Sequence, residues 1–294
     1  MDEADGISGL GEDATMPQRY SIVVTCKGRL RYLLQSLPRF LAQPATEVVV
    51  VDYNCPEDTA KTVNERHPEA VVVCVPDVAE FHLADARNIG AAAATGDVLI
   101  FLDADIVIPA DFVARIEARI RDDVFFRFPL SEEIRGRSGS CVVRKRHFER
   151  VGGYDDLIRG YGGDDLDLYF RLSRIGVEEL PLDESYIESI IPHDPDTRTT
   201  FYKARSIADN VAINFAYLQM KFAALRFYNR SNLRRDVLEK FYAVAQKRVA
   251  ATPEEDGSSI KFEVVLGGEE ALPLLKHWKV SRSLVIRMER AKSD

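Results

Sequence analysis

The sequence predicts an α/β fold in which helices flank a mixed, mainly parallel central sheet. Its short β-branched runs are apolar throughout rather than alternating, which is typical of strands that are buried on both faces. Stretches with apolar residues at helical spacing separate these runs, as in parallel β-α-β units. The 294 residues are 46% hydrophobic and 29% charged, enough for one large globular domain with an appendage.

Each predicted element has its own local justification. The strands are the β-branched runs at residues 21–25, 47–52, 70–75, 97–103 and 141–143. The helices are the periodic stretches at residues 30–41, 59–66 and 85–94. Pro44 follows the first helix, Asn54-Cys-Pro56 stops the second strand, and Gly96 follows the alanine-rich third helix.

The last third of the chain differs from the rest in charge and in pattern. Residues 201–294 carry a net charge of +6, which leaves −14 for residues 1–200. An apolar stripe predicts a long helix through Val211, Phe215, Leu218, Phe222 and Leu225. Beyond it we expect strands at 261–266 and 283–288 and a short helix at 272–278. We therefore divide the chain into a disordered acidic tail (1–16), a catalytic domain (17–197) and a mainly helical C-terminal extension packed on it (198–294).

Several classes of protein are disfavoured. No run approaches the roughly 20 apolar residues of a membrane span, and the acidic start is unlike a signal peptide. The four cysteines form no CxxC pair, which favours reduced packing residues and a cytoplasmic protein. A net charge of −8 argues against nucleic-acid binding. Neither GxGxxG nor GxxxxGK[ST] is present, which disfavours dinucleotide and P-loop chemistry.

The strongest chemical signals follow the apolar runs, because ligands of such sheets bind at the carboxyl ends of the strands. Asp103-Ala-Asp105 follows the fourth strand and supplies two hard carboxylates that suit Mg²⁺ or Mn²⁺ bridging a diphosphate. Such a triplet also arises by chance on solvated loops, and that reading stays open for the triplet alone.

Arg87-Asn-Ile-Gly90 followed by Gly96-Asp97 and Asp103-Ala-Asp105 resembles the nucleotide-sugar domain of GT-A glycosyltransferases. Residues 21–30 and 50–52 resemble the first strand, the loop and the second-strand aspartate of family 2 enzymes. The resemblance implies that Asp52 reads a uracil and that Asp103 and Asp105 bind the metal. The nucleotide-sugar contacts that it implies are Thr25, Arg29, Asp52, Arg87, Asn88, Asp103 and Ala104.

Gly152-Gly-Tyr-Asp-Asp156 and residues 160–172 resemble the acceptor element of β-1,4-galactosyltransferases and chondroitin-polymerase-like transferases. Its glycines let the backbone approach a sugar closely, and a helix N-terminus then follows. The resemblance implies that Asp165 is the general base. It implies acceptor contacts by Asp164, which replaces the usual Glu, and by Tyr161, Gly162 and Gly163.

His193, in Ile190-Ile-Pro-His-Asp194, stands where these transferases place a metal-binding histidine, and we expect it to join Asp103 and Asp105. A lone histidine is more often a surface or packing residue, and that alternative stays open. Leu166 replaces an acidic residue that the galactosyltransferases carry, which puts the acceptor pocket in doubt.

Together these features predict a metal-dependent inverting transferase that moves a hexose or N-acetylhexosamine from a UDP-sugar to a saccharide hydroxyl, in bacterial surface polysaccharide synthesis. The alternatives are a retaining transferase, a sugar nucleotidyltransferase and a non-catalytic nucleotide-sugar-binding protein. The acceptor is a carbohydrate or a lipid-linked saccharide. Residues 201–250 are basic and aromatic, which is compatible with contact at the inner face of a membrane. A helical cap on the sheet is the preferred reading of that segment.

Overall fold

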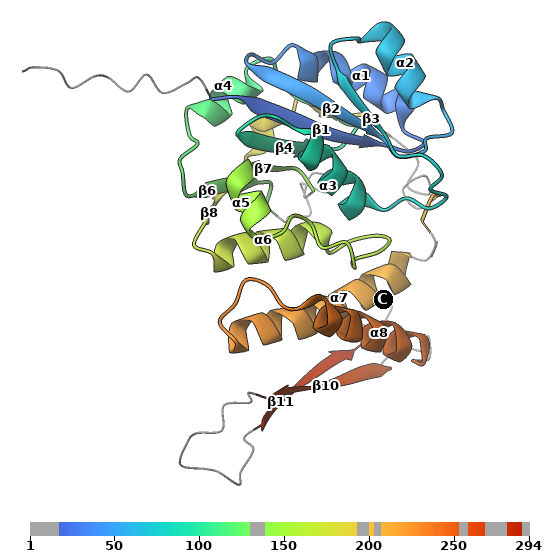
Figure 1. The fold of residues 1–294 in the computed structure, drawn as a ribbon, viewed down its shortest axis with the longest axis vertical. Coiled ribbons are helices and arrows are strands. Elements are labelled where there is room, and N and C mark those ends of the chain that lie inside the picture. The colour runs from blue at the N-terminus through green and yellow to red at the C-terminus, as the bar shows by residue number, and fades with distance from the viewer. Residues whose placement is uncertain are drawn as a thin grey trace, which may run out of the picture.

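The computed structural model describes residues 18–129, 139–192, 200–202, 207–252, 258–267 and 281–289. The predicted tail at 1–16, the predicted helix at 272–278 and His193 lie outside these ranges. Within them, the predicted α/β architecture is confirmed: a seven-stranded sheet with helices on both sides forms the N-terminal part of the molecule (Figure 1).

The order of the strands in the sheet is β3-β2-β1-β4-β7-β6-β8. Only β7 runs against its neighbours β4 and β6, and the other pairs are parallel. The strands are β1 (Tyr20–Cys26), β2 (Thr46–Asp52), β3 (Val71–Cys74), β4 (Val98–Leu102), β6 (Val124–Arg127), β7 (Cys141–Arg144) and β8 (Glu178–Pro181). Because β1, β2 and β4 are parallel neighbours, the loops that follow them meet at one edge of the sheet.

Two hydrophobic clusters sandwich the sheet. One packs α1, α2 and α4 on one face, and the other packs α3, α5 and α6 on the opposite face. The helices are α1 (Leu30–Leu41), α2 (Thr59–Arg66), α3 (Leu83–Ala93), α4 (Phe112–Glu117), α5 (Lys145–Arg150) and α6 (Asp164–Arg174). A 3₁₀ turn, η1 (Glu184–Tyr186), precedes the short strand β9 (Ser189–Ile190), which pairs with β5 (Ile106–Val107).

Most of the elements predicted in the first half are found at nearly the same bounds. The predicted helices 30–41 and 59–66 coincide with α1 and α2. The sequence did not predict β6 and β8. They are strands because each pairs with a neighbour that is distant in the chain.

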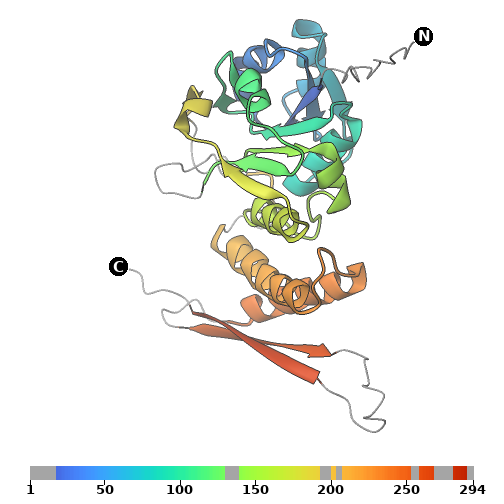
Figure 2. The ribbon, with the colours of Figure 1, turned by 90° about the vertical axis from the view of Figure 1, so that its left-hand side faces the viewer.

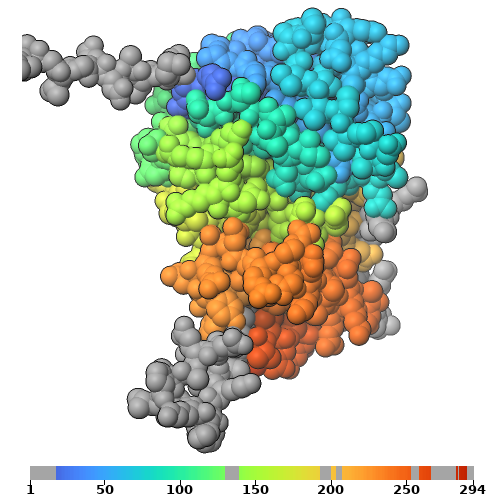
Figure 3. All heavy atoms as spheres, viewed as in Figure 1, coloured from blue at the N-terminus to red at the C-terminus, as the bar shows by residue number. Residues whose placement is uncertain are grey.

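The C-terminal segment forms a helical pair and a hairpin, α7 (Ile207–Phe227), α8 (Arg235–Ala250), β10 (Ser259–Gly267) and β11 (Ser281–Glu289). Two perpendicular views place α7 and α8 beyond α6, with the hairpin farthest from the sheet (Figures 1 and 2). In Figure 3 the atoms of the helical pair abut those of the 151–174 region. Among the described residues, no helix combines the length and the apolar character that a membrane crossing requires.

The helix α7 is buried more widely than its predicted stripe. Ala216, Tyr217 and Met220 are also buried, in a cluster that the helix shares with α8 and the hairpin. Two polar side chains on the helix, Asn214 and Lys221, are 0% and 2% exposed. A narrow stripe predicts a helix that caps one surface. The helix instead lies between the catalytic domain and the rest of the extension.

Candidate active site

A cavity of about 310 Å³ opens at the carboxyl ends of β1 and β4, a volume in the lower part of the range of small-molecule sites. One wall is formed by residues at or just after the ends of strands, among them Thr25, Arg29 and the Asp103–Asp105 triplet. The glycine-rich loop and the start of α6, residues 161–166, form the opposite wall. The fold therefore brings the two sequence motifs together across one cavity.

Arg87, on α3, connects the two walls. Its side chain is 3% exposed, and its guanidinium donates to Asp103 Oδ1 and to Asp164 Oδ2, each at 3.0 Å. The guanidinium also lies 5.2 Å from the centre of the Tyr154 ring. A planar cation that donates in two directions fixes the spacing between its two carboxylates. Arg87 thus sets the distance between the DXD aspartate and the start of α6.

The DXD triplet supplies two carboxylates to the cavity. The Asp103 side chain is 37% exposed, whereas that of Asp105 is 11% exposed and lies 3.4 Å from Arg29 Nη1. Ala104 lies between them and also lines the cavity. Mg²⁺ is commonly bound by one or two carboxylates together with substrate phosphates, and Mn²⁺ favours similar oxygen ligands, so this donor set fits either ion.

The third predicted metal ligand, His193, lies just beyond the last described residue of its segment. That segment, Ser189–Ile190 followed by Ile191 and Pro192, is anchored beside the triplet. The Ile191 N–H donates to the carbonyl of Asp105 at 2.8 Å, next to the Ile106–Ile190 pair of β5 and β9. In the described ranges, no group of three His, Cys, Asp or Glu side chains is arranged as a metal site.

The loop that leads into α6 takes a backbone conformation that requires glycine. Gly160, Gly162 and Gly163 have φ values of 71°, 85° and 100°, in the left-handed region that other residues rarely adopt. Gly163 is the N-cap of α6, so Asp164 and Asp165 are its first residues. This turn directs the N-terminus of the helix, with its two carboxylates, at the cavity.

The two carboxylates have different surroundings. Asp164 is paired with Arg87, whereas no Lys or Arg of the described segments forms an ion pair with Asp165. Burial, and then the negative charge of Asp164, raise the pKa of Asp165 to about 7, against the opposing effect of Arg87. A carboxyl with a pKa near neutrality can exchange a proton at physiological pH.

Two predicted nucleotide contacts do not line this cavity. Asp52 accepts hydrogen bonds from the backbone N–H groups of Cys55 and Ala60, each at 2.8 Å, and lines a separate hollow beside α2. The Asn88 side-chain amide donates to and accepts from the backbone of Tyr154, at 2.9 and 2.8 Å. In the structure both side chains organise loops, and their contacts with a nucleotide stay predictions.

Sequence reasoning missed several residues of the cavity. Lys27 is 6% exposed, and its ammonium donates to the carbonyls of Tyr53, Asn54 and Val78. Burial lowers the pKa of Lys27. Four aromatic side chains also line the cavity beyond the predicted Tyr161: Phe81, Phe201, Tyr202 and Phe215. The aromatic enrichment after residue 200 was visible in the sequence, but its position in the fold was not.

Comparisons with known proteins agree with this architecture. Residues 21–150 match the model of glycosyl transferase family 2, and residues 112–193 match that of glycosyltransferase like family 2. No curated protein matches the chain.

Solved structures of similar fold include a mannosyltransferase and a protein in complex with a UDP-sugar. The mannosyltransferase PcManGT from Pyrobaculum calidifontis, in complex with GDP-Man and Mn²⁺, superposes with a TM-score of 0.53 at 16% identity, over 82% of this chain and 77% of that one. S. aureus TarS 1-349 in complex with UDP-GlcNAc gives 0.57 at 14% identity, over 79% and 72%. The chain has the GT-A fold, and the family matches support glycosyltransferase activity.

Proposed function

We propose that the protein is a metal-dependent inverting glycosyltransferase that moves a hexose or N-acetylhexosamine from a UDP-sugar to a saccharide hydroxyl. The observation that carries the proposal is the single cavity between Asp103-Ala-Asp105 and the Asp164-Asp165 start of α6. A strand-end DXD and a carboxyl of raised pKa line the same cavity. Donor and acceptor can therefore meet between the two walls.

Asp165 is the general base of this proposal. Its carboxylate takes the proton of the acceptor hydroxyl as the acceptor oxygen bonds to the anomeric carbon and the bond to the diphosphate oxygen breaks. A single displacement of this kind inverts the anomeric centre. Asp164 is less suited to the role of base, because one of its oxygens already accepts a hydrogen bond from Arg87. It is suited to accept a hydrogen bond from the acceptor sugar.

Asp103, Asp105 and His193 are the residues that would hold Mn²⁺ or Mg²⁺. When bound, such an ion neutralises the charge that develops on the departing diphosphate. Arg29 lies beside Asp105 and faces the same cavity, so its guanidinium adds positive charge at the expected diphosphate position. Thr25 and Ala104 complete the wall against which the donor lies.

The choice of UDP rests on the resemblance of Asp52 to the second-strand aspartate of family 2 enzymes. The similar structures hold different donors, GDP-Man in PcManGT and UDP-GlcNAc in TarS, so the nucleotide has to be tested directly. We further propose the cytoplasm as the site of action, bacterial surface polysaccharide synthesis as the role, and a carbohydrate or lipid-linked acceptor. The exposed basic residues Lys240, Lys247 and Arg248 of α8 are compatible with contact at the inner face of a membrane.

Calorimetric titration with UDP, GDP and dTDP, each with and without Mn²⁺, tests the donor site. We expect UDP to bind best, binding to require Mn²⁺, and Asp105→Ala to abolish the effect of the metal. Asp123→Ala, an exposed carboxylate in the loop before β6, is the matched control. If no nucleotide binds under either condition, the proposed donor site is wrong.

Asp165→Asn tests the base. Loss of a general base lowers turnover by about 10²–10⁴-fold, while UDP affinity is retained because Asp165 is not among the residues proposed to hold the metal or the nucleotide. The measurement is UDP-sugar turnover with a panel of saccharide acceptors, and NMR of fresh product reports the anomeric configuration. Full activity of Asp165→Asn would refute the assignment of the base, and a retained configuration would refute the single displacement.

A further inference from the structure

The C-terminal helix α7 reaches the active-site loop through one buried amide. Asn214 is 0% exposed, and its side-chain nitrogen donates to the backbone carbonyls of Arg159, Gly162 and Tyr161, at 2.9, 2.8 and 3.3 Å. An amide nitrogen carries two hydrogens, so one of them is shared between two carbonyls. A single side chain of the extension therefore holds most of the loop between Ile158 and α6.

This loop depends on such a clamp. Its glycines at 160, 162 and 163 all have positive φ, so the chain there has neither helical nor sheet hydrogen bonding of its own. Glycine-rich backbone loses more conformational entropy on ordering than any other. Hydrogen bonds from a rigid helix fix the position of the loop. They thereby also fix the positions of Asp164 and Asp165 in the cavity wall.

The same face of α7 forms part of the cavity wall. Val211 and Phe215, one turn apart, line the cavity beside Tyr161 and Leu166. Val211 lies against Gly162, where an added Cβ would come within 3.6 Å of its side chain. Leu218, one turn farther on, would lie 3.1 Å from a Cβ at Gly163. The contact at Gly162 is an ordinary van der Waals distance, whereas a Cβ at Gly163 would press on Leu218.

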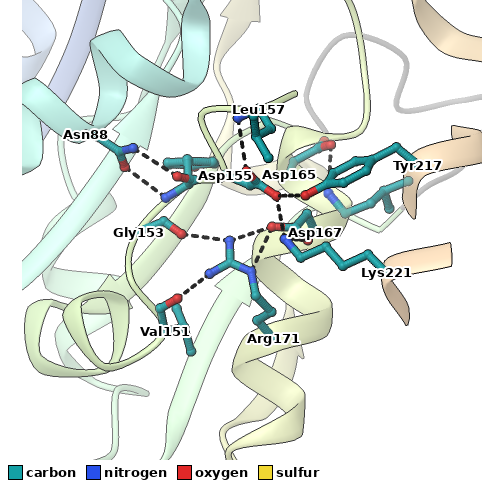
Figure 4. Close-up of polar contacts among 12 residues, drawn as sticks. Asn88, Val151, Gly153, Asp155, Leu157, Asp165, Asp167, Arg171, Tyr217 and Lys221 are labelled. Carbon is teal, nitrogen blue, oxygen red and sulfur yellow. Dashed lines mark hydrogen bonds and ion pairs between the residues drawn. The ribbon is translucent and has the colours of Figure 1, made fainter. Parts of the chain in front are cut away.

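A second buried contact holds α7 against α6. The Lys221 ammonium lies 2.6 Å from Asp155 Oδ2 and 2.6 Å from Asp167 Oδ1, and all three side chains are at most 6% exposed (Figure 4). Tyr217 also donates to Asp155. Asn214 and Lys221 are two turns apart on one face of α7, and they fix this face to the glycine loop and to α6. The side chains of α7 therefore keep a constant position relative to Asp165.

We infer that α7 builds the acceptor subsite, with Asn214 as a positioning residue and Phe215 and Val211 as the wall that receives the acceptor sugar. The inference rests on the proposed function and names the half of the cavity that the acceptor occupies. The wall is apolar and half-buried, and the carboxylates of Asp164 and Asp165 lie beside it. This combination fits a pyranose, whose C–H face packs on an aromatic ring while its hydroxyls reach the carboxylates.

The test compares Asn214→Ala and Phe215→Ala with Gln219→Ala, an exposed amide on the same helix. Three readouts are needed: UDP affinity by calorimetry, release of UDP from the UDP-sugar with water as acceptor, and transfer to methyl and p-nitrophenyl pyranosides. We expect both variants to raise the acceptor KM about tenfold or more, which corresponds to ~1.4 kcal/mol of lost binding. We expect their UDP affinity and water-dependent UDP release to stay within about twofold, a free-energy change near 0.4 kcal/mol. Gln219→Ala should match the unmodified protein in all three.

Other outcomes separate this inference from the proposed function. An unmodified protein that neither binds UDP nor releases it from a UDP-sugar refutes the proposed function. An unmodified protein that does both, combined with an unchanged acceptor KM in Phe215→Ala, overturns the subsite alone. A parallel fall of donor binding and of transfer in Asn214→Ala shows a general structural role and also overturns the positioning role. If Asn214→Ala does not fold, Phe215→Ala decides, because its side chain makes no hydrogen bond.

Discussion

The two walls of the cavity are built in different ways. The donor wall follows adjacent strands of one sheet, so the register of β1 with β4 positions Thr25 and Asp103. The proposed acceptor wall combines a glycine loop and a helix start with Val211 and Phe215 of α7, and the loop is held by Asn214, some 50 residues farther along the chain. Backbone pairing holds the first wall, and buried polar side chains hold the second.

The buried polar network behind the acceptor wall is balanced in charge. Lys221 and Arg171 face Asp155 and Asp167, and Arg171 also donates to the carbonyls of Val151 and Gly153 (Figure 4). Two cations and two carboxylates leave no net charge in the low-dielectric interior. Such a network confers little stability when complete, but removal of one member leaves an uncompensated charge. The acceptor wall should therefore be the more sensitive of the two to single substitutions.

The largest expected effect on stability is that of Lys221→Met. It leaves Asp155 and Asp167 with one cation between them, and breaking a buried pair in this way costs about 3–5 kcal/mol. Urea denaturation monitored by circular dichroism measures the change in the free energy of unfolding. Lys240→Met, at an exposed position on α8, should change it by less than about 0.5 kcal/mol. Equal effects of the two substitutions would contradict a network that holds the acceptor wall.

Arg87→Gln removes the connection between the two walls. We expect a loss of about 1–3 kcal/mol of stability, less than for Lys221→Met, because Asp103 is partly solvated. We also expect weaker UDP binding and lower turnover in the same variant, since Asp103 and Asp164 both lose their cation. Arg31→Gln, on the partly exposed start of α1, serves as the control. If only UDP binding or only turnover changed, Arg87 would support one wall of the cavity and would not connect the two.

The pKa of Asp165 gives the acceptor wall its own pH dependence. Because the base must be ionised, kcat should rise with pH and level off above about 7. Arg87 opposes the rise of this pKa, so in Arg87→Gln the rise of kcat should occur at higher pH. An acid limb near pH 4 would show that Asp165 is not the titrating base.

The same pKa predicts a stability effect of opposite sign to the activity effect. A carboxyl whose pKa is raised on folding contributes stability below its unfolded pKa, near 3.9, and this stability is lost as pH rises through the folded value. Asp165→Asn should therefore raise the Tm at pH 8 more than at pH 4, although it removes activity. Differential scanning fluorimetry at both pH values measures this, and a fall of the Tm at pH 8 would show that ionised Asp165 stabilises the fold.

The sequence predicted the strand ends and the glycine-aspartate element that line the cavity, but not the side chains that hold this element in place. Strand ends are readable because apolar runs stop at Thr25 and Asp103, and parallel pairing then brings these residues together. The glycine-aspartate element was also readable, since its spacing is local. Asn214 and Lys221 were not, because each looks like an ordinary polar residue of an amphipathic helix. Their partners are 52 to 66 residues away, and no local pattern records such a distance.

The smallest expected effect concerns the surface contact between the extension and the catalytic domain. Arg235, on α8, forms an ion pair with Asp156, and both side chains are about half exposed. Water and salt screen such a pair, so Arg235→Ala should cost about 0.2–1 kcal/mol and leave transfer unchanged. Urea denaturation at low and at high salt checks this. The difference in the free energy of unfolding between Arg235→Ala and the unmodified protein should shrink as salt is added. A loss comparable to that of Lys221→Met would mean that the surface, rather than the buried network beside Asp165, holds the acceptor wall in place.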